Sequence, residues 1–267
     1  MSGTKKSIGA ITVVIAAFGG VVMLGSAASA AVTGLQQIGP QSGQLTTDAR
    51  GVTSIDLEVG GAEVRVMFDD VDEAELRVEG ASANGWTLRT DGDELEVHGP
   101  DRGFDWWSPD WLRGDERAVL VLPLALEGVD ADLTLHAGSL DVVGEFGGLG
   151  VDVNAGALSL NGDARDLDLE VNAGRADIEL RGVEQAQFTI SAGRIVSTLA
   201  SVPDSVDFTV SAGSLDLTLP DEEYDLRRQV SAGSLDSSLD ESTDSPHRIS
   251  GSVSAGSATL RPGGAGE

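Results

Sequence analysis

The chain of 267 residues contains no cysteine and few aromatic side chains, which make up 4% of it. Without cysteine it can form neither disulfides nor thiolates, so composition leaves the redox compartment open. Its three histidines, His98, His136 and His247, stand in separate segments, and their spacing predicts neither a metal cluster nor a Ser-His-Asp set. We therefore expect no enzyme, no catalytic residue, no cofactor and no metal site.

Two catalytic or metal-binding alternatives have weak support. A carbohydrate-active β-helix enzyme needs clustered acidic residues in a groove, whereas acidic residues recur here about once per repeat. Calcium could bind along Asp216 and Asp236, but the glycine-rich nonapeptide calcium pattern is absent. Both alternatives are distant ones.

Basic residues are also scarce. The chain has 17 Lys and Arg against 44 Asp and Glu, a formal net charge of -27. Such a surface repels nucleic acid and anionic lipid, because both carry dense negative charge. We expect no nucleic-acid partner, and an acidic surface that mainly serves solubility.

The N-terminal segment lacks charge over a long stretch. Lys5 and Lys6 precede it, and no charged residue occurs between Ser7 and Thr47. Residues 1–32 therefore resemble either a cleaved secretory signal peptide, with a small-residue site at 28–30, or an uncleaved signal-anchor helix. Both alternatives place the rest of the chain outside the cytoplasm, secreted or anchored to the membrane by this one segment.

A repeated phrase dominates the remaining sequence. "VSAGSLDLTL" at 210–219 returns as "VSAGSLDSSL" at 230–239, and weaker copies precede and follow them. Successive Ala-Gly pairs are 18, 18, 19, 20, 20 and 23 residues apart. A period near twenty is typical of a repeat protein whose units stack on one another.

Each copy predicts two strands joined at a corner. Apolar residues alternate before the Ala-Gly pair and after it, but the alternation slips by one residue at the pair itself. A corner there keeps both apolar faces inside. Glycine suits a corner that needs a positive φ, and alanine suits its cramped inner side. The predicted corner glycines are Gly138, Gly156, Gly174, Gly193, Gly213, Gly233 and Gly256.

We therefore predict an all-β fold, a single-stacked parallel β-solenoid of about 18–20 residues per coil, preceded by an N-terminal apolar helix. The expected organisation is a flexible spacer at 33–50, N-terminal coils and a cap at 51–122, solenoid repeats at 123–262 and a disordered tail at 263–267. Equivalent residues should form ladders. The inner ladder in chain order is Leu140, Leu158, Ala176, Ile195, Leu215, Leu235 and Ala258.

The phrases "SAGSLDL" and "GGAEVRV", with the "VLVLP" strand before the first clear repeat, resemble the bacterial putative-adhesin family of unknown function with β-strand repeats. The resemblance covers about residues 50–262. It implies a glycine-cornered β-solenoid outside the membrane, with an N-terminal membrane or export segment. It implies a surface protein, adhesin-like or accessory to an envelope-stress system, and identifies no catalytic motif.

An insert at 102–117, "RGFDWWSPDWLRGDER", departs from that pattern and holds three of the four tryptophans. Buried, its aromatic side chains would close the end of the solenoid. Exposed, they would bind a partner. The candidate partner-binding residues are Phe104, Trp106, Trp107 and Trp111.

The sequence therefore predicts a non-enzymatic, extracytoplasmic surface protein that presents its repeat ladders to an unknown cell-envelope protein or glycan. The alternative is a regulatory accessory that senses envelope stress. Contact with a membrane would be made through residues 1–32 if they are not cleaved.

Overall fold

The computed structural model describes residues 42–80, 85–100 and 116–263. Within these ranges the fold is almost entirely β-strand, and η3 (Leu124–Leu126) is a short 3-10 helix. The strands are β1 (Ser42–Thr47), β2 (Ser54–Val59), β3 (Ala62–Asp69), β4 (Ala74–Glu79), β5 (Thr87–Asp91), β6 (Glu94–His98), β7 (Arg117–Pro123), β8 (Asp130–Leu135), β9 (Gly138–Arg181), β10 (Gln185–Leu199), β11 (Ser205–Leu219), β12 (Glu223–Ser237), β13 (Asp240–Glu241) and β14 (Arg248–Pro262). No helix among the described residues is long and apolar enough to span a membrane.

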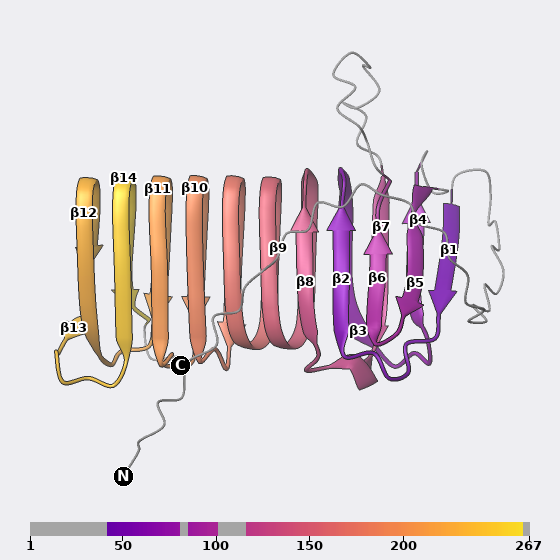
Figure 1. Ribbon diagram of the computed structural model, residues 1–267, viewed down its shortest axis with the longest axis horizontal. Helices are drawn as coiled ribbons and strands as arrows, with labels where there is room; N and C mark the ends of the chain where they lie inside the picture. Colours follow the sequence, from indigo (N-terminus) through magenta and orange to yellow (C-terminus); the bar gives the residue numbers. More distant parts are fainter. Residues whose placement is uncertain (1–41, 81–84, 101–115, 264–267) are drawn as a thin grey trace, which may run out of the picture. The chain divides into compact units, whose positions relative to one another are not determined.

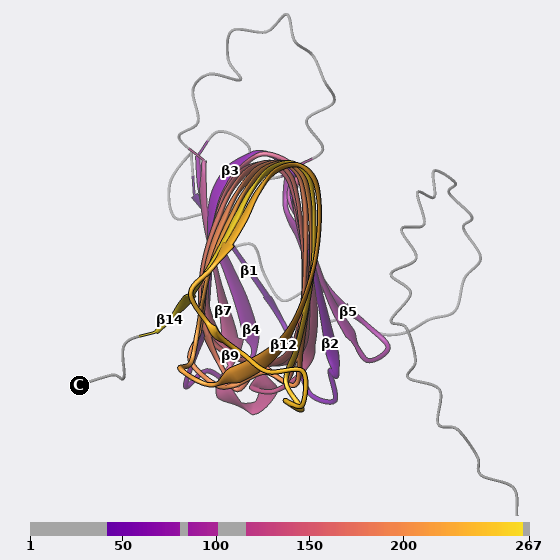
Figure 2. The ribbon, with the colours of Figure 1, turned by 90° about the vertical axis from the view of Figure 1, so that its left-hand side faces the viewer.

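The repeated segments lie side by side and pair in parallel through equivalent residues (Figure 1). Each segment runs up one wall, turns at its Ala-Gly pair and returns along a second wall, so the segments superpose when viewed along the stack (Figure 2). We call the residues before each corner the first wall and those after it the second wall. The first wall comprises 54–59, 130–135, 149–153, 166–171, 185–190, 205–210, 248–253 and 225–230.

The sheet as a whole is mixed. β4 runs antiparallel to β1 and β7, and β5 runs antiparallel to β6. The prediction of an all-β fold is confirmed, but the sheet is not the purely parallel one expected. A tight turn explains one reversal: Gly92, with a φ of +64°, lets β5 fold straight back onto β6.

The last two repeats are stacked in the reverse of their chain order. β14 pairs with β11 on one side and with β12 on the other, although β12 precedes it in the sequence. The inner ladder predicted from the sequence was therefore wrong at its end, because Ala258 lies between Leu215 and Leu235. The terminal coil of the stack is β12, which pairs on its outer side with β13 only at Glu223 and Tyr224.

Arg228 explains why β12 is terminal. It holds an inward ladder position that Phe188, Phe208 and Gly251 hold in the neighbouring coils. An arginine buried between two coils would lose its hydration, a cost that an apolar core does not return. At the end of the stack the side chain is exposed and forms an ion pair with Glu241.

Gly251 in turn favours β14 as the neighbour of β11. The Phe208 ring lies over Gly251, where a Cβ would come within 2.2 Å of Phe208 Cζ. Phe208 is only 3% exposed in this arrangement. The missing side chain on β14 therefore makes room for a large aromatic side chain of the preceding coil.

Inward side chains of both walls form one continuous apolar core. Most are valine, leucine and isoleucine, and many are fully buried, as are Phe188 and Tyr224. The core thins at the terminal coil, where Val230 is 42% exposed. Burial at roughly 25 cal/mol per Å² of apolar surface makes stacking of coils the main source of stability.

The predicted corner glycines lie at the corners, but only some of them have the positive φ that was expected there. Four of the seven have positive φ: Gly138 (99°), Gly156 (123°), Gly174 (148°) and Gly233 (122°). Gly193, Gly213 and Gly256 do not, so the predicted positive φ was wrong for these three. At all seven, a Cβ would lie 2.1–2.6 Å from a backbone carbonyl oxygen of the adjacent coil. Close approach of neighbouring coils is the shared requirement.

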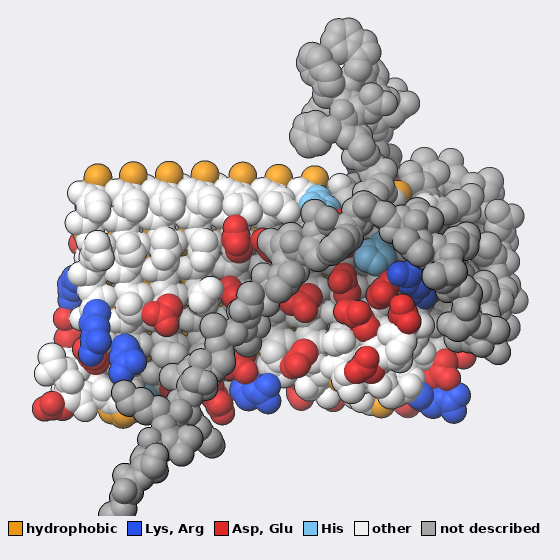
Figure 3. Space-filling model, in the orientation of Figure 1, with side chains coloured by type: hydrophobic (Ala, Val, Ile, Leu, Met, Phe, Trp, Pro, Cys, Tyr) orange, Lys and Arg blue, Asp and Glu red, His pale blue; other side chains and the backbone are white. Residues whose placement is uncertain are grey.

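The corner alanines face solvent, not the cramped inner side that the sequence suggested. Both Ser211 and Ala212 are exposed, because the chain turns between two inward residues, Val210 and Leu215. The extra residue that interrupts the inward-outward alternation of side chains therefore lies on the outer side of the corner. The equivalent alanines produce a line of small apolar side chains along one edge of the stack (Figure 3).

Strands β1, β4 and β5 close the opposite end of the sheet. The spacer expected at 33–50 differs here, because β1 lies within it and its Leu45 packs against the core. The hydroxyls of Thr47 in β1 and Thr90 in β5 lie 3.4 Å apart. Nearby, the indole of Trp86 is 4% exposed and donates a 2.6 Å hydrogen bond to Glu116.

Several predictions concern residues outside the described ranges. These are the apolar helix at 1–32, the aromatic residues Phe104, Trp106, Trp107 and Trp111, and all of the tail after Gly263. The insert is joined to the fold at a corner, because β6 ends opposite Glu58 and β7 begins opposite Glu63, on either side of the Gly60-Gly61 corner.

Candidate binding face

The outer face of the first wall changes in character along the stack. Two rows of outward side chains run across its strands. Near β2 and β8 these rows carry carboxylates, whereas near β10, β11 and β14 they carry mostly hydroxyls and amides. Figure 3 shows the acidic side chains gathered on one part of the visible face. Each row forms because alternate residues of a strand point to the same side of the sheet, and equivalent residues of paired strands lie next to one another.

The carboxylates of this face perturb one another. Burial raises the pKa values of Asp56, Asp132 and Asp152, and neighbouring carboxylates raise them further. Burial also raises the pKa of Asp168, against the effect of a hydrogen bond from Gln187. The pKa of Glu94 is raised by burial and by four nearby acidic residues. We call this region near β2 and β8 the acidic part. The raised pKa values mean that ionising these carboxylates is less favourable in the folded protein than in the unfolded chain.

Two histidines meet on one carboxylate in this acidic part. Glu58 lies 2.7 Å from His136 Nε2 and 3.3 Å from His98 Nδ1, and the hydrogen bond from His136 is the main cause of the lowered pKa of Glu58. Asn154 Nδ2 lies 3.3 Å from His136 Nδ1. Because an amide nitrogen only donates, His136 Nδ1 accepts and Nε2 carries the proton given to Glu58.

This cluster links four consecutive coils through side-chain hydrogen bonds. Among the described residues, no group of three or more His, Cys, Asp or Glu side chains is arranged to hold a metal ion. Asp216 and Asp236, weighed above as calcium ligands, are separated by Thr259. The histidines stand in separate segments of the sequence, and the pairing of β2 with β6 on one side and with β8 on the other brings two of them to Glu58.

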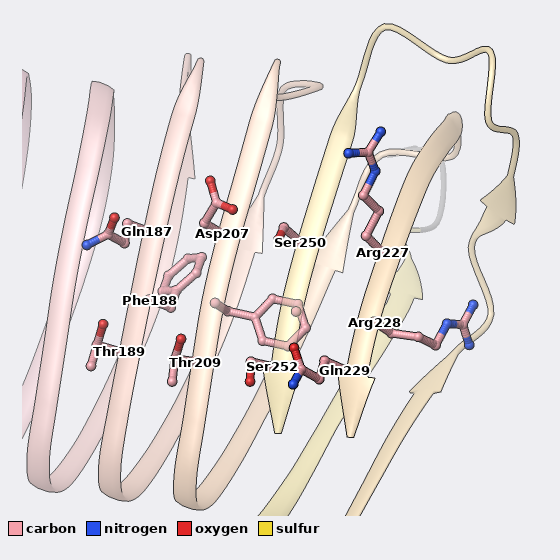
Figure 4. Close-up of a pocket in the computed structure, with 12 residues that line it drawn as sticks. Gln187, Phe188, Thr189, Asp207, Thr209, Arg227, Arg228, Gln229, Ser250 and Ser252 are labelled. Carbon is pink, nitrogen blue, oxygen red and sulfur yellow. The ribbon is translucent and has the colours of Figure 1, made fainter. Parts of the chain in front are cut away.

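A shallow trough lies on the first wall at its β12 end (Figure 4). We use "the trough" for this depression, which has a volume of about 480 Å³. Its two sides are the outward rows, and its base is the backbone between them. The lining residues are Gln187, Phe188, Thr189, Asp207, Phe208, Thr209, Arg227, Arg228, Gln229, Ser250, Gly251 and Ser252.

At its β12 end the lining of the trough includes Arg227, which points outward, and Arg228, which holds the inward position described above. Arg227 donates to Asp225 at 2.8 Å, and its side chain remains 65% exposed. Arg228 pairs with Glu241. At the opposite end, Gln187 Nε2 donates to Asp168, the first carboxylate of the acidic part. The trough therefore runs from a negative end to a positive end within a strongly acidic chain.

The outward side chains that line the trough are polar. They are hydroxyl and amide groups, the guanidinium group of Arg227 and one carboxylate, Asp207. Phe188 and Phe208 are inward and 0% and 3% exposed, so the trough offers no aromatic surface. The sequence analysis missed this site, although the outward positions of "FTI", "FTV" and "GSV" already showed a change from acidic to hydroxyl side chains.

Fold and site together define an all-β protein of stacked repeats with a polar trough on one outer face. No protein-family model and no curated protein matches the chain. It is similar to a crystal structure of a putative adhesin from Bacteroides fragilis, at 15% identity and a TM-score of 0.48, covering 84% of this chain and 98% of that chain. It is also similar to a putative adhesin from Parabacteroides merdae (10% identity, TM-score 0.42, covering 84% and 97%) and to a putative lipid binding protein from Parabacteroides distasonis (11%, 0.30, 84% and 98%).

Proposed function

We propose that the protein is a non-enzymatic, extracytoplasmic β-solenoid, adhesin-like in role, that displays the first wall of its repeats to a partner in the cell envelope. The trough carries this proposal, because it is a concave polar site on an otherwise regular and acidic surface. Residues 1–32 would export the chain or anchor it to the membrane.

The position of the trough supports display. β1 lies at one end of the sheet, whereas β12 and β13 lie at the other end. The trough spans the four coils at the β12 end. The site therefore lies at one end of the stack of coils.

The test is capture of a partner from envelope extract by the full-length chain with a tag after Glu267. The trough variant is Thr189→Val combined with Thr209→Val, which removes two outward hydroxyls and keeps the side-chain volume. The matched control is Thr198→Val combined with Thr218→Val, an equivalent pair on the second wall. We expect the parent and the control to retain the same partner and the trough variant to lose it. Equal retention by all three proteins would contradict the proposal.

A further inference from the structure

We infer that the trough binds an acidic oligosaccharide, a linear chain of sugar units lying along the stack with a carboxylate at the arginine end. This inference rests on the proposed function, since it names the chemistry of the partner at the same site. The observations that carry it are the hydroxyl and amide rows, the absence of an apolar anchor from the lining, and the position of the charges.

The two rows suit a ligand that is rich in hydroxyl groups. Thr189, Thr209 and Ser252 occupy equivalent positions in three adjacent coils, and Gln229 continues that row (Figure 4). Adjacent strands are about 4.8 Å apart, so polar groups recur at that interval along the trough. Hydroxyls both donate and accept hydrogen bonds, which matches the mixed donors and acceptors of sugar units.

A protein or lipid partner fits the lining less well. The base of the trough is backbone of β10, β11 and β14, each already paired on both sides, so no strand can be added there. Protein partners and lipid chains bind most strongly where the surface offers apolar side chains. The two phenylalanines of the lining face the core and present no ring to a ligand.

The charges around the trough determine which end of the ligand carries the carboxylate. Arg227 donates a hydrogen bond to Asp225 through Nη2. The remaining N–H groups of its planar guanidinium can therefore donate to a carboxylate of the ligand. Asp168 and Glu170 bound the trough at the other end and would repel an anionic group there. A nucleic acid, which needs cations along its whole length, is therefore disfavoured, whereas an oligosaccharide with its acid near Arg227 is accommodated.

The experiment measures binding of hyaluronan disaccharide, one uronic acid unit joined to one N-acetylated sugar unit, to the purified full-length protein by calorimetry. The neutral disaccharide of chitin serves as the uncharged ligand. Arg227→Gln removes the positive charge at the trough, and Arg194→Gln removes an arginine paired with Asp216 on the second wall. We expect hyaluronan disaccharide to bind the parent and Arg194→Gln equally and to bind Arg227→Gln about tenfold more weakly.

Three results would overturn the inference: no binding of hyaluronan disaccharide, equal binding of the neutral disaccharide, or equal binding to Arg227→Gln. The proposed function is judged separately. If the envelope partner is still lost from the threonine variant but hyaluronan disaccharide neither binds nor competes with it, the oligosaccharide inference fails and the display function stands.

Discussion

At the scale of the residue, the corner glycines show how closely the coils approach one another. A Cβ on Gly213 would lie 2.3 Å from Gly193 O, although Gly213 itself has no positive φ. Its neighbour Ala212 points to solvent. Two consecutive residues of the same corner thus have opposite tolerance for an added methyl group.

We predict that Gly213→Ala lowers the free energy of unfolding by about 1–3 kcal/mol, because the methyl group forces the two coils apart. Ala212→Val, the matched control, should change it by less than about 0.5 kcal/mol. Urea unfolding followed by circular dichroism measures both. Equal unfolding midpoints for the parent and Gly213→Ala would show that the coils are not in close contact at this corner.

At the scale of the element, β12 is the terminal coil, and no other described strand pairs with its outer edge beyond Tyr224. Residues 225–237 pair with β14 on one side, and on the other side β13 reaches only as far as Tyr224. Such edges associate with other strands unless something prevents it, and an inward-pointing charge is a common protection. Arg228 is that charge, placed between the partly exposed Leu226 and Val230.

We therefore predict that Arg228→Leu increases self-association of the protein, because it extends the apolar inner ladder to the open end. Gln229→Leu is the control, since it adds the same side chain to an outward position of the same strand. Size-exclusion chromatography with light scattering, over a range of protein concentrations, reports the molar mass. A mass distribution for Arg228→Leu no different from that of Gln229→Leu would refute the role given to Arg228.

At the scale of the whole molecule, charge is distributed unevenly over a chain of net charge -27. Four carboxylates of the first wall have raised pKa values, and so does Glu94 in the neighbouring strand β6. A carboxylate whose pKa is raised by folding binds its proton more tightly in the folded state. Its stabilising effect is full below its ordinary pKa, 3.8 for Asp and 4.5 for Glu, and is lost as the pH rises through its folded pKa.

We predict that the free energy of unfolding increases as the pH is lowered from neutrality towards 4.5, the ordinary pKa of Glu, because carboxylates with raised pKa values take up protons before they would in the unfolded chain. The lowered pKa of Glu58 acts in the opposite sense, and its contribution is lost only as the pH falls through that pKa. Urea unfolding at constant ionic strength measures the effect. Asp132→Asn should reduce the slope, and a stability that instead falls steadily over this range would contradict the prediction.

The sequence by itself determined the local units. The alternation of apolar residues around each Ala-Gly pair is enough to predict two strands and a corner, since side chains of a strand must alternate between core and solvent. The period near twenty predicts that these units stack, because a single coil buries too little apolar surface to fold alone. The polar trough could have been recognised from the outward positions, once the register was known.

Only the tertiary structure decided how the units are ordered. The phrases at 210–219 and 230–239 share their first seven residues, so local pattern cannot say which coil lies next to which. The order depends on long-range fit: Gly251 receives the Phe208 ring, and Arg228 needs the solvent at the open end. In the same way, only pairing between coils brings His98 and His136 to Glu58, because contacts across the stack join residues far apart in the chain.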